Sequence, residues 1–331
     1  TIKFNSNDGS AVDSITANYD ILVTKPADPT REGYTFAGWF KDENLTNAWN
    51  FETDTMPVNG ITLYAKWIAN SYSVIFNANS GEGSMESQTF TYDAAQRLTA
   101  NAFTKTGYKF LGWSLNQSAT EAEYTDGQEV RNLASENETT VTLYAVWQIN
   151  QYTITFNSND GSAVASITDD YNTSVTLPTP TKEGHAFAGW YSDESLNTQY
   201  TSDKMPAENI TLYAKWDINQ YTITFDSNGG SEVDSITKDY ATTISKPTDP
   251  TKIGHTFAGW FKDNETFLQE WNFETNTMPV DGITLYAKWT ANSYNVKYYV
   301  DSEIILNESV DYGTSVPKPA DPTKTGHIFK G

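Results

Sequence analysis

A seven-residue string that returns along the chain constrains its fold more than any other feature of the sequence. Ile61-Thr-Leu-Tyr-Ala-Lys-Trp67 recurs unchanged at residues 210–216 and 283–289. It appears a fourth time with small changes, as Val141-Thr-Leu-Tyr-Ala-Val-Trp147. Copies spaced by tens of residues are typical of arrays of small folding units. The sequence therefore predicts a tandem array rather than the two or three ordinary domains that 331 residues would otherwise favour.

Each copy of this string closes one predicted repeat, and a strand led by tyrosine opens the next. Repeat 5 lacks the closing string, and repeat 2 is a divergent variant because it is longer between Ser114 and Glu138. The predicted bounds are residues 1–67 for repeat 1, 72–147 for repeat 2, 152–216 for repeat 3, 221–289 for repeat 4 and 294–331 for repeat 5.

The linkers and the two ends of the chain lead to further expectations. Only four residues separate neighbouring repeats, and linkers this short restrict the angle between neighbours. Thr1 falls inside a strand pattern and Gly331 inside an unfinished repeat. We therefore expect the chain to be a segment of a longer protein, in which repeat 5 is less stable than the complete repeats.

Alternation of apolar and polar residues predicts strands at both ends of a repeat. In the opening strand of repeat 3, Tyr152, Ile154 and Phe156 share one face, as a period of two requires. Asn157-Ser-Asn-Asp-Gly161 follows and predicts a hairpin turn to a second strand over residues 166–171. The closing string alternates as well, so its Leu, Ala and Trp residues are predicted to face the core.

The middle of a repeat combines a proline segment with a Gly-Trp motif. Lys25-Pro-Ala-Asp-Pro-Thr30 is predicted to be an ordered loop, because proline cannot donate a sheet hydrogen bond. Gly33-Tyr-Thr-Phe-Ala-Gly-Trp39 is predicted to continue into a strand with Trp39 as a core anchor. Its inner glycine allows a backbone or a large ring to approach closely. Beyond this strand, residues 44–49 and 267–271 are compatible with one helical turn.

Composition excludes several classes of function. The formal net charge is −21, whereas nucleic-acid binders carry a basic face and anionic membranes attract basic segments. There is no cysteine, and no run approaches the roughly 18 apolar residues of a membrane-spanning helix, so we expect no membrane insertion. Aromatic residues are 14% of the chain and can compensate for the small core of a repeat of about 70 residues.

The three histidines do not form a site. His185, His255 and His327 each follow a glycine, at the position where Tyr34 and Tyr108 stand in other repeats. They are about one repeat apart, whereas a metal centre or a catalytic triad needs clustered partners. We interpret them as rings that replace tyrosine at the edge of a repeat.

The remaining polar motifs are interpreted as structural. Asn5-Ser-Asn-Asp-Gly9 lacks the spacing of an EF-hand loop and is read as a hairpin turn, with a weak surface Ca²⁺ site left open. Carboxylates are scattered among turns, whereas a glycosidase needs two that face a cleft. The sequence therefore predicts no enzymatic activity, no cofactor, and no catalytic, cofactor-binding or metal-binding residue.

Together these motifs resemble the Listeria–Bacteroides repeat family, which includes the B repeats of internalin-type surface proteins. The resemblance rests on Tyr221-Thr-Ile-Thr-Phe225, on the run from Pro250 through Gly-His-Thr-Phe-Ala-Gly to Trp260, and on the closing Leu-Tyr-Ala-Lys-Trp289. It covers repeats 1 to 4 and the first half of repeat 5. Repeat 2 departs from the pattern after Trp113.

The resemblance implies a fold, a location and two alternative functions. The implied fold class is mainly β or α+β, a string of small β-grasp-like (ubiquitin-like) domains with mostly antiparallel sheets. The implied protein is secreted, extracellular and attached to the bacterial cell wall through parts outside this chain. The lack of cysteine is ordinary for a Gram-positive bacterial surface protein, and we expect a monomer. The chain would then be a structural stalk that projects a binding domain. The alternative is that the repeats themselves bind a host or environmental protein or a glycan multivalently.

Overall fold

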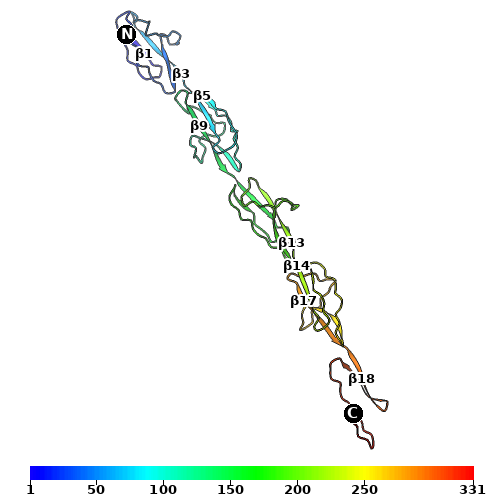
Figure 1. Cartoon of the computed structure of the whole chain (residues 1–331). Helices are drawn as coiled ribbons and strands as arrows, with labels where there is room; N and C mark the ends of the chain where they lie inside the picture. The colour runs from blue at the N-terminus through cyan, green and yellow to red at the C-terminus, as the bar shows by residue number, and fades with distance from the viewer. The chain divides into compact units, whose positions relative to one another are not determined.

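The computed structural model describes residues 1–331, and every regular element in it is a β-strand (Figure 1). The mainly β prediction is confirmed, whereas the α+β alternative is wrong because no helix forms. Internal contacts divide the residues into two compact units. One contains Thr1–Ile154, Ile167–Val175 and Asp203–Asn209, and the other contains Thr155–Ser166, Thr176–Ser202 and Ile210–Gly331.

A separate small sheet forms in each repeat. Repeat 1 has three strands, repeats 3 and 4 have four, repeat 2 has four and an extra two-stranded sheet, and repeat 5 has two. In repeat 1 the order is β1 (Ile2–Asn5), β3 (Ile61–Ala69), β2 (Tyr34–Phe40). In repeat 2 it is β5 (Gln88–Thr91), β4 (Ser71–Asn77), β9 (Thr140–Ile149), β7 (Tyr108–Ser114), beside the pair β6 (Gln96–Arg97) and β8 (Glu129–Val130).

The other repeats follow the same plan. In repeat 3 the order is β11 (Ile167–Asp170), β10 (Gln151–Asn157), β13 (Ile210–Ile218), β12 (His185–Tyr191). In repeat 4 it is β15 (Ile236–Asp239), β14 (Gln220–Asp226), β17 (Ile283–Ala291), β16 (His255–Phe261). Repeat 5 pairs β18 (Ser293–Val300) with β19 (Glu303–Asp311).

The first and last strands of a complete repeat pair in parallel, and in the four-stranded sheets this pair lies in the middle. In repeat 1, Ile2 lies opposite Ile61 and Phe4 opposite Leu63, and the parallel pairs β4·β9 and β14·β17 repeat this arrangement. The outer pairs are antiparallel, as predicted. A parallel pair needs a long connection, and the proline segment, the Gly-Trp strand and the loops that follow supply it.

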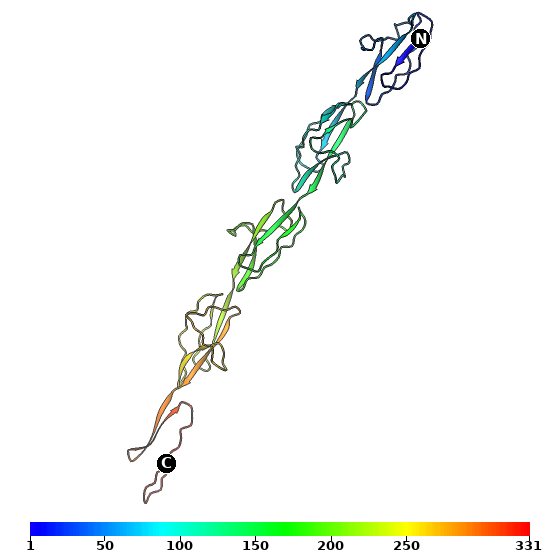
Figure 2. The same ribbon diagram turned by 180° about the vertical axis from the view of Figure 1, so that it is seen from behind.

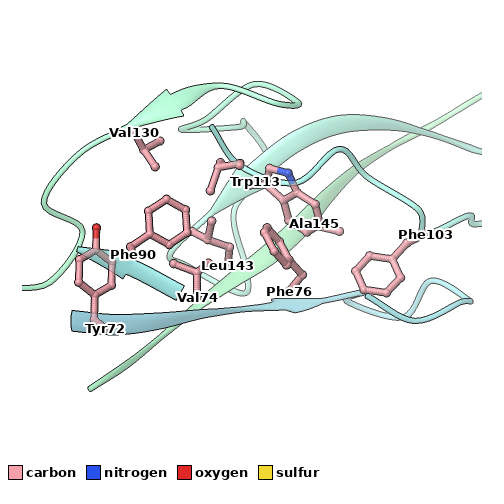
Figure 3. Packing of buried hydrophobic residues seen from close by; sticks show 10 residues of the cluster. Tyr72, Val74, Phe76, Phe90, Phe103, Trp113, Val130, Leu143 and Ala145 are labelled. Atoms are coloured by element: carbon pink, nitrogen blue, oxygen red, sulfur yellow. The ribbon is translucent and has the colours of Figure 1, made fainter. Parts of the chain in front are cut away.

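The Gly-Trp strand places its tryptophan at the centre of the core, as predicted. Trp39, Trp113, Trp190 and Trp260 are at most 3% exposed. In each of β2, β7 and β12 the register against the closing strand shifts by one residue at the inner glycine. Such a β-bulge is a common use of glycine in a strand. In repeat 2, the core gathers strand residues around Trp113 and Leu143, with Phe90 and Phe103 beside them (Figure 3).

The closing tryptophans are half-buried and have a second role. Trp67 packs edge-on against Phe36, with ring centroids 5.4 Å apart, and its Nε1–H donates to the Ser6 carbonyl at 2.8 Å. The same bond from indole to opening turn is made by Trp147, Trp216 and Trp289 at 2.8–2.9 Å. These residues pack against the core and also hold the turn after the first strand.

The linkers are shorter than the expected four residues. β3 ends at Ala69 and β4 begins at Ser71, so only Asn70 lies outside the strands. One asparagine likewise separates β9 from β10, β13 from β14 and β17 from β18. Figure 1 and its reverse view, Figure 2, show the last strand of a repeat leading directly into the first strand of the next. The residues flanking each asparagine are strand residues because they continue the ladders of the two adjoining sheets.

The one-turn helix considered at residues 44–49 is wrong. Asp42 accepts hydrogen bonds from the N–H groups of Thr46 at 3.2 Å and Asn47 at 2.8 Å. Leu45 adopts a left-handed φ of 56°, and the chain returns so that the Trp49 N–H donates to the Trp39 carbonyl at 2.7 Å. A side chain that caps nearby N–H groups competes with helix formation.

The equivalent loop of repeat 4 leads to a pH prediction. The Thr266 hydroxyl, the Thr266 N–H and the Phe267 N–H all donate to Asp263, and these bonds lower the pKa of Asp263 to about 2. Because the folded pKa lies below the ordinary value of 3.8, the contribution to stability is present above about pH 4 and is lost as the pH falls towards 2. We expect an NMR titration of the Asp263 carboxyl carbon to show a midpoint near 2, with the Phe267 amide shift following it. A midpoint near 3.8 would contradict the loop geometry.

Repeat 5 consists of a single two-stranded hairpin. No third strand pairs with β18 or β19, and Tyr299, Ile304 and Ile305 are exposed. An isolated hairpin is at best marginally stable in water. The expectation that repeat 5 is less stable than its neighbours therefore stands as a prediction.

Candidate functional site

The candidate site is the place where one repeat meets the next. Three residues recur at each of the four junctions: a glycine of the earlier repeat, the linker asparagine, and a tyrosine of the later repeat. We call this set, with the aromatic residue that follows the glycine, the repeat junction. The glycine, asparagine and tyrosine are Gly33, Asn70 and Tyr92; Gly107, Asn150 and Tyr171; Gly184, Asn219 and Tyr240; and Gly254, Asn292 and Tyr312.

The backbone of the asparagine ties the two repeats together. At the first junction the Asn70 N–H donates to the Gly33 carbonyl at 2.9 Å, and the Asn70 carbonyl accepts from the Tyr92 N–H at 2.8 Å. At the other three junctions the same two bonds measure 2.8–2.9 Å. A single residue outside the strands thus has both backbone groups satisfied, one by each repeat. This geometry restrains the torsions of the linker.

The junction glycine leaves room for the ring of the junction tyrosine in the next repeat. All four junction glycines have φ between 70° and 77°, a left-handed conformation that glycine adopts at no steric cost. A Cβ built on any of them would overlap the junction tyrosine ring. The ring therefore lies directly against the glycine backbone, and a residue with a Cβ would displace the ring.

The aromatic residue after the glycine completes the contact. Tyr34 meets Tyr92 edge to face with ring centroids 5.8 Å apart, and Tyr108 meets Tyr171 in the same way. At the later junctions His185 and His255 take this position and pack on the tyrosines of the following repeats, at 6.1 Å and 5.7 Å.

The interpretation of His185 and His255 as rings replacing tyrosine at a repeat edge is confirmed. Their Nδ1 atoms lie 2.8–2.9 Å from the carbonyls of Glu183 and Ile253, which can only accept, so Nδ1 carries the proton. His327 is exposed, and its ring contacts no other ring in the structure. Its ring makes only the equivalent bond, from Nδ1 to the Thr325 carbonyl at 3.1 Å.

The first junction carries extra polar contacts. The Tyr34 hydroxyl donates to Asp93 at 2.8 Å, and this bond raises the pKa of Tyr34. Asp93 also accepts from the Asn132 amide at 3.0 Å, and these two bonds lower the pKa of Asp93. The hydroxyl–carboxylate bond is specific to this junction, because asparagine, alanine and glycine follow the tyrosine at the other three.

No group of three or more His, Cys, Asp or Glu residues is arranged to hold a metal ion. In the turn considered for Ca²⁺, Asn5 accepts from the Asn7 N–H at 3.1 Å and the Asn7 side chain donates to the Ala65 carbonyl at 2.8 Å. Both side chains therefore serve the turn and the closing strand.

The junction residues were not recognised from the sequence, although a signal was present. Asparagine is the only residue shared by all four linkers, and a tyrosine ends the second-strand segment of every repeat. Neither residue is part of an apolar periodicity, so pattern analysis does not mark them. Their roles depend on a contact between repeats that sequence spacing does not reveal.

Comparison with known proteins identifies relatives of the whole chain. A model described as the Listeria-Bacteroides repeat domain matches residues 1–66, 72–146, 152–215, 221–288 and 294–331. Two proteins of Evansella cellulosilytica, named as a Gly-rich membrane protein and a membrane protein, are 37% and 38% identical across 100% of this chain. Internalin H of Listeria monocytogenes is 47% identical over 115 residues, 34% of the chain.

These relatives are much longer than the chain. It spans 29% and 39% of the two Evansella proteins, and the matched part is 20% of Internalin H. The names of the Evansella proteins refer to a membrane, but the structure of this chain contains no helix of the length and hydropathy needed to cross one.

Proposed function

Because this chain belongs to the Listeria–Bacteroides repeat family, we propose that it is a non-enzymatic stalk segment of a bacterial surface protein. In this proposal the parent protein is secreted, and parts outside this chain attach it to the cell wall. The observation that carries the proposal is the repeat junction, which recurs four times with the same hydrogen bonds and the same seated tyrosine. An array whose every joint is restrained can hold a terminal domain away from a surface.

Charge and sheet order support the same proposal. The net charge of −21 makes neighbouring repeats repel one another and keeps the array soluble. The parallel pairing of first and last strands is consistent with a β-grasp-like arrangement in which irregular segments replace the helix. The β-grasp assignment is therefore part of the proposal.

The stalk reading predicts an extended particle in solution. A compact globule of 331 residues would have a radius of gyration of about 20 Å, whereas four repeats in line, reaching on the order of 110–150 Å, would give at least about 30 Å. We expect small-angle X-ray scattering of residues 1–331 to give the larger value. A radius near 20 Å, from clustered repeats, would contradict the proposal.

Direct adhesion through exposed aromatic residues is the alternative. No tryptophan appears among the exposed large side chains, and within repeats 1 to 4 the only such tyrosine is Tyr19. An exposed aromatic patch that recurs from repeat to repeat would favour adhesion, and these residues do not make one. A glycan array and a pull-down with residues 1–331 test this alternative. Specific binding that increases with the number of repeats would replace the stalk reading with a multivalent adhesin.

A further inference from the structure

Tyr19 of repeat 1 occupies the position of the four junction tyrosines, but no glycine of another repeat lies against it. The segment Ile15-Thr-Ala-Asn-Tyr19 corresponds to Ile167-Thr-Asp-Asp-Tyr171 and Ile236-Thr-Lys-Asp-Tyr240. Tyr92, Tyr171 and Tyr240 are half-buried, whereas Tyr19 is 67% exposed. Its N–H has no acceptor in the structure, while each of the other four donates to a linker asparagine.

The backbone around Tyr19 already has the junction conformation. Asp20 has a φ of 64°, close to the 63° of Asp93 and Asn172. The Asp20 N–H donates to the Met56 carbonyl at 3.0 Å, as the Asn172 N–H does to the Met205 carbonyl at 2.9 Å. The backbone beside the exposed tyrosine therefore has the junction conformation before any partner arrives.

We propose that Tyr19 and Asp20 form a docking surface for a glycine–tyrosine turn of another repeat of this family. The glycine backbone would lie against the Tyr19 ring, as Gly33 and Gly107 lie against Tyr92 and Tyr171. Each of the four junctions within the chain pairs such a tyrosine with a glycine turn. At Tyr19 only the tyrosine side of this interface is present. The inference does not depend on whether the array is a stalk or an adhesin.

The acidic residue selects tyrosine over histidine in the incoming turn. Among the junctions, only Tyr92 is followed by aspartate, and there the partner ring is Tyr34, whose hydroxyl donates to Asp93 at 2.8 Å. Tyr240 and Tyr312 are followed by alanine and glycine and meet histidines. Because Asp20 follows Tyr19, the matching turn carries a hydroxyl donor after its glycine.

The chain also presents one unoccupied turn, of the histidine kind. Gly326 has a φ of 78° with nothing within 4 Å of a Cβ built on it. The His327 N–H donates to the Lys324 carbonyl at 3.0 Å, as in the occupied turn of His255. A second copy could thus offer Gly326 and His327 to Tyr19, but without the tyrosine hydroxyl.

The test extends the full chain by a copy of residues 72–152 placed directly before Thr1. This copy carries a Gly-Tyr turn and a linker asparagine. In the native chain its last residue is followed by Thr153, which corresponds to Thr1, so Thr1 takes the position of Thr153 after the copy. We expect the Tyr19 N–H to exchange with solvent about tenfold more slowly than in residues 1–331 alone. We also expect the α-protons of the copied glycine to shift upfield under the Tyr19 ring.

Two variants of the extended chain, compared with residues 1–331 alone, test the proposed contact. In the extended chain, Gly→Ala at the copy of Gly107, or Tyr19→Ala, should remove the upfield glycine shift, and the former should also restore fast exchange at Tyr19. Exchange at Tyr19 that is equally fast with and without the added repeat would overturn the proposal. So would concentration-dependent self-association of residues 1–331 in sedimentation that Tyr19→Ala abolishes, because the occupant would then be the histidine turn of a second copy.

Discussion

Replacing Trp113 by alanine is expected to lower the free energy of unfolding of repeat 2 by about 3–5 kcal/mol. Trp113 is fully buried, and its ring lies 4.8 Å from Phe76 and 5.0 Å from Phe110, centroid to centroid. Alanine would leave a cavity among side chains that come from different strands and loops, so they cannot collapse into it together (Figure 3). A repeat this small has little stability to lose.

Hydrogen exchange resolved by segment is the measurement, because one unfolding curve for five repeats does not report on one of them. The control is Leu115→Ala, two residues away and 46% exposed, which should change stability by no more than about 0.5 kcal/mol. Protection should fall throughout repeat 2 for Trp113→Ala only. A loss confined to the Gly-Trp strand would show that Trp113 is not the centre of the core.

Replacing Gly107 by alanine is expected to open the junction between repeats 2 and 3. The new Cβ would overlap the Tyr171 ring and would hold alanine at a φ of 77°. The backbone strain alone is worth about 1–2 kcal/mol, and displacing the ring adds the loss of its edge-to-face contact with Tyr108. We expect the N–H groups of Asn150 and Tyr171 to lose their protection from exchange, because both bonds cross the junction.

Gly127→Ala separates ring displacement from backbone strain. Gly127 belongs to the same repeat and has a φ of 64°, but nothing lies within 4 Å of a Cβ built there. It should show the strain without any change at Asn150 or Tyr171. Equal effects of the two substitutions on these amides would mean that the tyrosine ring does not hold the junction. A variant with alanine at all four junction glycines should also scatter as a more flexible particle than the native chain.

Much of this fold could be predicted from local pattern. The alternation in Tyr152-Thr-Ile-Thr-Phe156 places Ile154 inside, and the structure buries it completely. The Gly-Trp motif places Trp39 and its equivalents in the core for the same reason: a large ring in an apolar stripe has few other places to go. The family assignment also follows from the sequence, because it depends on the motifs themselves.

Other features could not be predicted, either because a side chain competes locally for backbone hydrogen bonds or because the partners lie far apart along the chain. The helical turn at residues 44–49 was wrong because Asp42 satisfies the N–H groups of Thr46 and Asn47 with its own side chain. The sequence places the junction histidines at a repeat edge, but it does not identify the tyrosines that they meet. Tyr240 lies 55 residues beyond His185, and nothing in its neighbourhood marks it as a partner.

Local sequence pattern was enough to predict the repetition, most of the strands and the buried tryptophans. These features arise from periodicity and residue type within a few neighbouring positions. Two features emerge only from the three-dimensional fold. First and last strands pair in parallel, and one asparagine joins two repeats through both of its backbone groups. A backbone hydrogen bond, or a ring that packs on a glycine, depends on which distant segments the fold brings together. The residue type at one position does not specify which segments those are.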